Sequence, residues 1–422
     1  MSRVLIIGCG IVGAAIAYEL STIAGLDVTL IDRQPPAQES TGAALGVLMG
    51  VISQKKQGRG WHLRELSLQQ YETWIPQLEA ETGQIIPFNR DGLVLLTVER
   101  DDMTKWEKLR SRRQSQGWSL EIWDRAQLCD RIPLIGQQLN GSIHADMPLE
   151  HHPEAITGAI YSPHDRQVDP VALTQALVTV SQHRGVAVHT DMDVQAIQRS
   201  PSSQHSYVVQ TSEKIVETDW IIIAAGLGST VLAKSLAQSL EQSLPRSSAS
   251  SPVPSSAQSV DIRPVLGQAI HLRLPPTAEP RPNATDFRPV MIGDGINVVP
   301  VSPPRFNEYS NERLNQYSRE LPNEYWVGAT VEFPDESGKV KADNAQLKTL
   351  LERAIAFYPP LAQGDIVYQW SGCRPRPFGR PAPIIESLPD HPRVILATGH
   401  YRNGVLLAPA TAHLIRDMIT VS

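Results

Sequence analysis

The sequence predicts an α/β protein in which two domains are interleaved along the chain, one of them built on a parallel sheet. Three observations support this prediction. Residues 4–32 read as a strand, a glycine-rich turn, a helix and a second strand, which is the order of a βαβ unit. Residues 220–224 and 393–398 show the same short, continuous apolar runs. Residues 92–98, 268–274 and 325–331, which fall between these segments, read as strands of another sheet, so the chain leaves the first domain and returns to it.

Composition and charge narrow the function classes before any motif is considered. The 422 residues carry a formal net charge of −6 and show no basic stripe, which argues against a nucleic-acid-binding protein. No apolar run approaches the roughly 20 residues of a membrane span, and a strand is expected from the first residues, so no signal peptide is expected. Cys9, Cys129 and Cys373 are odd in number and far apart, so no disulfide framework is expected. We therefore expect a reduced, cytoplasmic protein.

The N-terminal segment carries the most informative motif. Residues 4–7 form a short apolar run of the kind that makes a strand buried on both faces, and residues 14–21 continue as a helix. Between them, Gly8, Gly10 and Gly13 follow the G-x-G-x-x-G spacing. Gly8 permits the tight turn out of the strand, Gly10 lets a pyrophosphate approach the backbone, and Gly13 lets the helix pack closely on the sheet.

An acidic residue completes this motif after the second strand, which is expected over residues 28–31. Asp32 can accept hydrogen bonds from a ribose hydroxyl, and phosphates would bind at the helix N-terminus, where free N–H groups and the helix dipole favour negative charge. The alternative is a glycine-rich turn in an ordinary βαβ unit, but strand, glycines, helix, strand and acid occur in order within about 30 residues. The motif predicts a Rossmann-like dinucleotide-binding domain and does not separate FAD from NAD.

Two later segments and the C-terminal turn favour FAD. The segment ESTGAALG at 39–46 combines hydroxyls with small side chains, which suits a loop lying against a flat ring system. The segment TDWIIIAAGLGS at 218–229 is a buried-type strand that ends in small residues, so its backbone can approach a dinucleotide from the far side. Taken alone, the first could be a flexible surface loop and the second an ordinary strand before a helix.

Eight motifs occur in order across nearly the whole chain: GCGIVGAAIAYEL, STGAALGVL, GAIYSPHDRQVDPVAL, WIIIAAGLGS, RPVLGQ, GATVE, WSGCRPRP and GHYRNGVLLAPAT. Together they resemble the D-amino-acid oxidase superfamily of FAD-dependent oxidoreductases, and within it glycine oxidase and the D-amino-acid dehydrogenases. The resemblance implies a Rossmann-like FAD-binding domain interleaved with an α+β substrate domain that has an antiparallel sheet. It also implies non-covalent FAD, because Cys373 lacks the neighbours of the cysteine that holds FAD in some relatives. A buried, unreactive thiol is expected there.

The motif and the resemblance together give the residues expected to contact FAD. They are Gly8, Gly10, Ile11, Val12, Gly13, Asp32, Arg33, Ser40, Thr41, Leu45, Gly46, Val47, Val194, Ala225, Gly226, His400, Tyr401, Arg402, Asn403, Gly404, Val405 and Leu406. In the family the C-terminal turn passes beside the isoalloxazine ring, and the next helix, expected here over residues 408–419, points its N-terminus at the pyrimidine edge. A capping turn on a surface helix would explain Asn403 and Gly404, but not Arg402 beside a strongly apolar run.

The family oxidises amines that lie next to a carboxylate. Arginine is the natural partner for that carboxylate, because its planar fork makes two charge-assisted hydrogen bonds. The resemblance places Arg374 at the substrate carboxylate and Arg402 near the substrate, whereas Arg376 and Arg380 are expected to be structural or solvent-facing. Asn297 stands where glycine oxidases have a tyrosine. A bulkier D-amino acid or an N-substituted glycine is therefore an alternative to glycine as the substrate.

The resemblance implies oxidative deamination of a small amino acid, with hydride transfer from Cα to flavin N5 that gives an imine and then an oxo acid. No acid or base is assigned, because the cofactor carries the redox chemistry. Oxygen as the acceptor would give hydrogen peroxide, whereas a D-amino-acid dehydrogenase would pass electrons to a quinone or another carrier. A non-catalytic flavin-binding module is the hypothesis of another class. A homo-oligomer is left open.

The domain limits follow from the same reading. The FAD-binding domain is expected to comprise residues 1–88, 163–236 and 372–422, and the substrate domain residues 89–162 and 237–371. Residues 239–259 are rich in Ser and Pro and lack apolar periodicity, which predicts a disordered loop, and 306–323 form a second polar insertion. His144, His151 and His152 lie near one another, but their spacing fits no zinc motif, so no metal site is expected.

Overall fold

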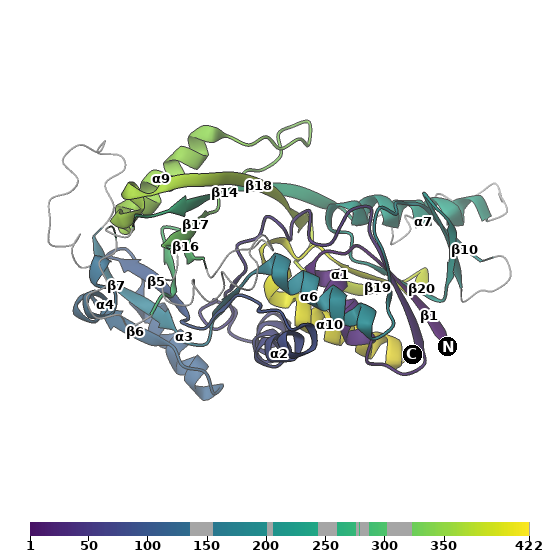
Figure 1. Cartoon of the computed structure of the whole chain (residues 1–422), viewed down its shortest axis with the longest axis horizontal. Coiled ribbons are helices and arrows are strands. Elements are labelled where there is room, and N and C mark those ends of the chain that lie inside the picture. The colour runs from purple at the N-terminus through teal and green to yellow at the C-terminus, as the bar shows by residue number, and fades with distance from the viewer. Residues whose placement is uncertain are drawn as a thin grey trace.

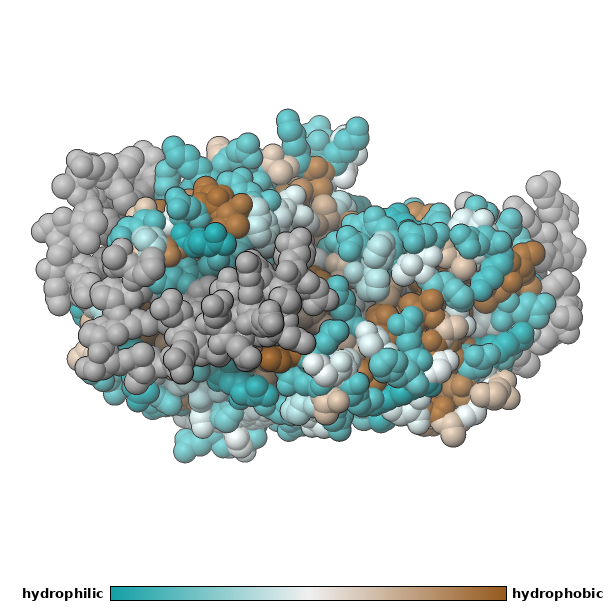
Figure 2. Space-filling model, in the orientation of Figure 1, coloured by the Kyte–Doolittle hydropathy of each residue, from teal (hydrophilic) through white to brown (hydrophobic). Residues whose placement is uncertain are grey.

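Two large sheets, placed side by side along the long axis of the molecule, make up the fold (Figure 1). The structure is a computed structural model that describes residues 1–135, 155–200, 206–243, 260–275, 278, 287–301 and 323–421. The face shown in Figure 2 is mostly hydrophilic, with apolar residues gathered in a few separate patches. Within the described residues, no helix has both the length and the apolar character that a membrane span needs.

The first sheet has six strands in the order β19-β20-β13-β1-β2-β9, and all neighbours are parallel except β19 and β20. The strands are β1 (Ser2–Ile7), β2 (Leu26–Ile31), β9 (Ala187–His189), β13 (Trp220–Ile223), β19 (Ile384–Leu388) and β20 (His391–Thr398). The first, middle and last parts of the chain therefore meet in one sheet, and the N- and C-termini lie close together in Figure 1.

Both faces of this sheet are covered, which explains the continuous apolar runs in its strands. One face carries helices α1 (Ile11–Leu20), α2 (Arg59–Thr82), α6 (Pro170–His183) and α10 (Gly404–Thr420). The other carries α7 (Ser229–Ser243) and a three-stranded sheet of β10 (Val194–Arg199), β11 (Tyr207–Thr211) and β12 (Ile215–Thr218). Along β1, Val4 and Ile6 pack under α1 and α10, whereas Leu5 and Ile7 pack under α7 and β10. A strand buried on both faces needs no polar alternation.

The second sheet has eight strands in the order β18-β14-β17-β16-β15-β5-β7-β6. They are β5 (Leu93–Val98), β6 (Glu121–Asp124), β7 (Ile156–Ser162), β14 (Ile262–Arg273), β15 (Val290–Gly293), β16 (Ile296–Pro300), β17 (Glu324–Gly328) and β18 (Asp365–Pro377). All neighbours are antiparallel except β15 and β5, which are parallel. The short helices of this half are α3 (Met103–Ser115), α4 (Arg125–Arg131), α9 (Asn344–Phe357) and the 3-10 turn η5 (Pro359–Gln363). A small sheet of β3 (Val47–Leu48), β8 (Arg166–Val168) and β4 (Phe88–Asn89) joins the two halves in sequence.

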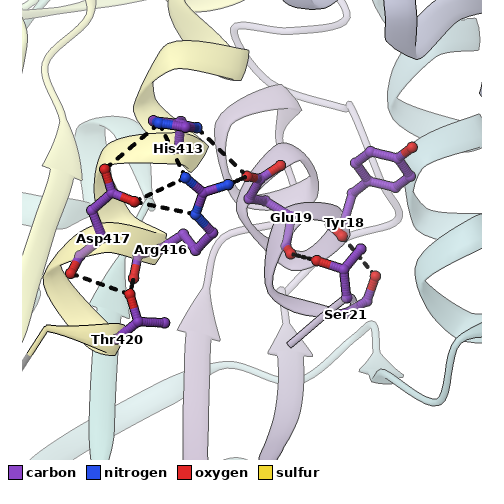
Figure 3. A network of polar contacts seen from close by, with 8 residues as sticks. Tyr18, Glu19, Ser21, His413, Arg416, Asp417 and Thr420 are labelled. Atoms are coloured by element: carbon purple, nitrogen blue, oxygen red, sulfur yellow. Dashed lines mark hydrogen bonds and ion pairs between the residues drawn. The ribbon is translucent and has the colours of Figure 1, made fainter. Parts of the chain in front are cut away.

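Helices α1 and α10 both begin at the carboxyl edge of the six-stranded sheet. Each follows a strand, β1 or β20, and these strands run parallel through β13. Figure 3 shows what holds the far ends of the two helices together: Arg416 of α10 contacts Glu19 of α1 at 2.7 Å and Asp417 at 2.9 Å, and His413 lies 3.8 Å from Glu19. The two N-termini are therefore held at the same edge, where ligands bind in open α/β sheets.

The two sheets confirm the predicted α/β fold class. Three predicted elements, two helices and one strand, differ in detail from the structure. Helix α10 begins at Gly404, four residues before the predicted start, and runs through Pro409. Helix α7 continues to Ser243, so residues 239–243, the start of the segment predicted to be a disordered loop, are helical. The strand at 92–98 is antiparallel only on the side of β7.

Other predictions fall beyond the part of the chain that the structure describes. These are the rest of the Ser/Pro-rich segment at 244–259, nearly all of the insertion at 306–323, and the histidines His144, His151 and His152. The domain limits stay a prediction.

Candidate functional site

A cavity of about 560 Å³ lies where the carboxyl edge of the six-stranded sheet faces the eight-stranded sheet. The strand ends of the first sheet contribute Gly8, Ala225 and Gly399, and β14, β16 and β18 of the second sheet form the opposite wall. This volume is typical of a small-molecule or cofactor site. The cavity is built from segments that are far apart in sequence.

The glycine turn after β1 is fixed by close packing. Gly8 has φ +112°, and a Cβ on it would lie 2.6 Å from the carbonyl oxygen of Ala224. A Cβ on Gly13 would lie 1.8 Å from the carbonyl oxygen of Gly8, so the first turn of α1 rests directly on the strand end. Gly8 and Gly10 line the cavity, and Gly13 supports them from below. The separate roles expected for Gly8 and Gly13 thus have a geometric basis in this chain.

The N-terminus of α1 opens into the cavity. Gly10 is the N-cap and, among the described residues, α1 has no side-chain cap that accepts from its N2 or N3 N–H. The Ile11 N–H donates to Oγ1 of Thr41 at 3.0 Å, which draws the loop after β2 against the helix. Ile11 and Val12 line the cavity. The remaining first-turn N–H groups and the positive end of the helix dipole can therefore meet an anionic ligand.

Asp32 lines the cavity and also holds the glycine turn. Its Oδ2 accepts from the Cys9 N–H at 2.6 Å and its Oδ1 accepts from the Gln34 N–H at 3.0 Å. Each carboxylate oxygen has more than one acceptor position, so a hydroxyl in the cavity can still donate to it. The neighbouring Arg33 pairs with Glu39 at 3.0 Å and is mostly exposed. The contact to Cys9 was not foreseen from the sequence.

The loop of residues 40–47 is bound to β18, the edge strand of the other sheet. Ser40 Oγ donates to the Cys373 carbonyl at 2.6 Å, and Trp370 Nε1 donates to the Ala43 carbonyl at 3.1 Å. A Cβ on Gly372 would lie 2.2 Å from the Ala43 Cβ, so glycine is needed at this contact. The loop thus holds the glycine turn of the first sheet at a fixed distance from β18, the strand that carries Arg374.

The C-terminal turn forms a further wall between β20 and α10. Gly399 and Tyr401 have φ values of +66° and +55°, and His400 between them is buried. Thr411 Oγ1 donates to the Leu407 carbonyl at 2.7 Å, so it can only accept from His400 Nε2, 2.9 Å away. Burial lowers the pKa of His400 to about 4, which keeps the ring neutral near pH 7.

Arg374 presents a largely buried positive charge on the wall of the cavity that β18 forms. Its Nη1 donates to the carbonyls of Leu266 and Thr330, each at 3.1 Å. Among the described residues no carboxylate lies within ion-pair distance of it, and burial together with nearby Arg402 lowers its pKa. A Cβ on Gly267 would lie 2.2 Å from Nη2, so the guanidinium lies flat against a glycine of β14. Arg402 lines the same cavity and is exposed. A largely buried cation whose hydrogen-bond partners are neutral carbonyls is a site for an anion.

Asn297 lines the cavity from β16, one strand beyond β17. Its Nδ2 donates to the Gly328 carbonyl at 3.1 Å, so the atom that it can offer to a ligand is the acceptor Oδ1. Cys373 also lines the cavity and is only half-buried, which corrects the expectation of a buried thiol. Burial raises the pKa of the Cys373 thiol, and the charge of Glu39 adds to this effect, so the thiol is a weak nucleophile at neutral pH.

The structure brings most of the predicted residues to this cavity. Those that line it are Gly8, Gly10, Ile11, Val12, Asp32, Arg33, Ser40, Thr41, Leu45, Gly46, Val47, Val194, Ala225, Gly226, Asn297, Arg374, His400, Tyr401, Arg402, Gly404 and Val405. Three predicted residues lie behind the lining: Gly13 under the glycine turn, Asn403 against Arg64 of α2, and Leu406 in the helix core. Arg376 lies 5.6 Å from the Tyr401 ring, and Arg380 pairs with Glu386 at 2.7 Å.

Sequence reasoning missed several small lining residues. Gly267 and Gly372 face each other across β14 and β18, and Ala43, Ala269 and Ala329 complete the wall around them. A glycine inside a strand often marks a close approach of another group, and both glycines lie in motifs quoted above. Their function became visible only from the register that sets Arg374 beside Gly267.

Comparison with known proteins places the chain among flavin-dependent oxidoreductases. The model of the family described as FAD dependent oxidoreductase (DAO) matches residues 3–418. The chain is 30% identical over 424 residues to a bifunctional ThiO/ThiG protein of Synechocystis, covering 99% of this chain and 51% of that protein. It is 26% identical to a glycine oxidase of Geobacillus kaustophilus, covering 99% and 92% of the two chains. The chain thus spans about half the length of the first of these curated relatives.

A solved structure shows the same fold. The crystal structure of glycine oxidase from Geobacillus kaustophilus superposes with a TM-score of 0.74 at 21% identity, covering 100% of this chain and 96% of that one. The match of the family model to nearly every residue carries the assignment. The chain belongs to the DAO family of FAD-dependent oxidoreductases.

Proposed function

We propose that this protein oxidises a small amino acid at the carbon that bears its amine, and that Arg374 binds the carboxylate of that substrate. The observation that carries the proposal is the state of Arg374. Its guanidinium is largely buried at the cavity wall and donates to two backbone carbonyls, and burial together with the charge of Arg402 lowers its pKa. A buried charge of this kind is costly unless a ligand of opposite charge completes it.

The residues present fit FAD, the cofactor of the family. Gly8 and Gly10 leave the backbone of the turn open, Asp32 offers acceptor positions, and the N-termini of α1 and α10 both lie at the cavity. Pyrophosphate at α1 and ribose at Asp32 would place the adenosine end of FAD on the six-stranded sheet. The flavin end would then extend toward Arg374, beside the first turn of α10. Non-covalent attachment is consistent with the raised pKa of Cys373.

The chain's own residues would bind and orient the substrate. Arg374 and Arg402 would hold the carboxylate, and Oδ1 of Asn297 would accept a hydrogen bond from the amine or from a polar substituent. His400 is neutral and its Nε2 is engaged by Thr411, so it would serve the shape of the turn rather than proton transfer. Bound FAD would supply the redox chemistry by accepting a hydride, two electrons and one proton, from the substrate Cα.

Sarcosine, D-alanine and glycine are the first substrates to consider. Ala269, Ala329 and Gly372 keep the wall near Arg374 free of large side chains, and Asn297 is smaller than a tyrosine. An N-substituted glycine or a short D-amino acid is therefore favoured over glycine alone. The electron acceptor is oxygen in an oxidase, and a quinone or another carrier in a dehydrogenase. A cytoplasmic location agrees with either acceptor and remains a prediction.

The test compares amines that differ only in the carboxylate. The wild-type protein should oxidise sarcosine, glycine or D-alanine with a kcat/KM at least about 30-fold above that for dimethylamine, methylamine or ethylamine, as a buried charge pair predicts. Arg374→Ala should remove most of this preference while the protein stays yellow. Equal kcat/KM for an amino acid and its decarboxylated analogue would reject the assignment of Arg374. Assays with oxygen and with an artificial electron acceptor would identify the acceptor class.

A further inference from the structure

One face of α2 contacts the N-cap and the first two turns of α10 through three side chains. Arg64, Ser67 and Tyr71 are spaced three and four residues apart, which puts them on the same face of the helix. Arg64 Nη2 donates to Oδ1 of Asn403 at 3.4 Å, Ser67 Oγ accepts from the Ala410 N–H at 3.2 Å, and the Tyr71 hydroxyl donates to the Val405 carbonyl at 2.5 Å. All three side chains are at least nine-tenths buried.

The Tyr71 contact satisfies a carbonyl that the helix itself cannot. In an α-helix each carbonyl accepts from the N–H four residues later, and for Val405 that residue is Pro409, which has no N–H. The Tyr71 hydroxyl occupies the place of the missing donor. Tyr71 is fully buried, and burial raises its pKa, so the hydroxyl keeps its proton and remains a donor.

The peptide unit between Val405 and Leu406 also carries an N–H, which points toward the cavity end of the helix. The carbonyl of Val405 and the N–H of Leu406 belong to one peptide unit, and that N–H is among the first-turn donors that have no acceptor within a helix. Within the described chain, α10 has no side-chain cap, because the Asn403 side chain accepts from Arg64 instead. A hydrogen bond to the carbonyl of a peptide unit strengthens the donor at its N–H. Gly404 and Val405 of this turn line the cavity.

We propose that Tyr71 is a positioning residue for the flavin: by donating to Val405 in place of residue 409, it orients and polarises the first turn of α10. From the same face of α2, Arg64 contacts Asn403 just before this turn, and Ser67 contacts Ala410 in the turn that follows it. The far end of α10 is held to α1 by Arg416 and Glu19, whereas the α2 contacts and the His400–Thr411 hydrogen bond act nearer the cavity. The inference rests on the proposed function in one respect, namely that the flavin end of FAD lies beside this turn.

The test removes the Tyr71 hydroxyl and then supplies the Val405 carbonyl with a backbone N–H donor in its place. In Tyr71→Phe, the dissociation constant of FAD should rise about fivefold, the loss of one ordinary hydrogen bond, and the midpoint potential of bound FAD should become more negative. In Tyr71→Phe/Pro409→Ala, the N–H of the new alanine can donate to the Val405 carbonyl, so both quantities should return to near the wild-type values. Tyr161→Phe is the matched control. The Tyr161 hydroxyl donates to the Asp91 carbonyl at 3.2 Å, and neither residue lines the cavity.

Each outcome bears on the proposal. A Tyr71→Phe protein with wild-type potential and FAD affinity would overturn it, and so would a double variant that folds but keeps the shifted potential. If Tyr71→Phe alone does not fold, the double variant still gives the answer, because its Val405 carbonyl has a donor. Failure of the proposed function has a separate readout: wild-type protein that holds FAD but is reduced by no amino acid. The potentials of the variants would still decide the role of Tyr71.

Discussion

Gly267→Ala is the substitution that most directly probes how Arg374 is held. The guanidinium of Arg374 lies against Gly267, and an added Cβ would be 2.2 Å from Nη2, 2.4 Å from Nη1 and 2.5 Å from Cζ. Ordinary contact for a Cβ begins at 3.4 Å, so the end of the arginine must move by about 1.2 Å. Gly267 has no positive φ, and the obstructing atoms are the far end of a side chain, so the backbone of β14 can stay in place.

The displacement should weaken carboxylate binding without removing any charge. Moving Nη1 by this distance breaks its bonds to the Leu266 and Thr330 carbonyls, both 3.1 Å long. A misplacement of about 1 Å in a positioned group costs on the order of 100-fold in rate, and a displaced charge pair is expected to lose about 2 kcal/mol, the lower end of the cost of removing one partner. We expect FAD to remain bound, acetate to bind about 30-fold more weakly, and kcat/KM for an amino acid to fall about 100-fold.

The assay is a titration of the flavin absorbance of each variant with acetate, a carboxylate that has no amine to oxidise. Gly60→Ala is the matched control, because a Cβ there meets nothing closer than 3.6 Å. Wild-type acetate affinity in Gly267→Ala would refute the placement of Arg374 as the carboxylate partner. Loss of FAD in that variant would instead show that β14 supports the cofactor.

Three further predictions test other walls of the cavity. Arg374→Ala should retain FAD and lose about 2 to 5 kcal/mol of acetate binding in the same titration; unchanged binding would contradict its role. Asp32→Ala should weaken FAD binding about tenfold or more, because Cys9 loses its acceptor and the ribose loses a charged one, and a variant that purifies fully yellow would count against this. The lowered pKa of His400, about 4 against an unfolded value near 6.5, means that stability is present above pH 6.5 and is lost as pH falls toward 4. Between pH 7.5 and 5, the free energy of unfolding of wild type, measured in urea, should therefore fall by about 2 kcal/mol more than that of His400→Gln.

Short-range patterns in the sequence were enough to predict the dinucleotide half of the site. Gly8, Gly10, Gly13 and Asp32 lie within one βαβ unit, and the turn, the close packing and the acid depend on residues near one another in sequence. The resemblance added Arg374 and the C-terminal turn, and the structure brings both to the same cavity. Such features are predictable because each glycine or acid has a local reason to be there.

Features that depend on distant segments could not be predicted. Gly267 matters because the register of β14 on β18 sets Arg374 beside it, and strand register is not written in either segment alone. Helix α10 was expected over residues 408–419, but it begins at Gly404. Its earlier turns are stabilised by Tyr71, which lies 334 residues away in sequence.

The central claim is that an amino acid reduces the FAD of this protein, and an anaerobic visible spectrum tests it most directly. The purified yellow protein is titrated in turn with glycine, sarcosine, D-alanine and D-proline, and is then opened to air. We predict loss of the flavin band with at least one of these amino acids, and recovery of the band in air or with an electron carrier. A yellow protein that none of them bleaches would contradict the proposed substrate class, and a colourless protein that takes up no FAD would contradict the cofactor site.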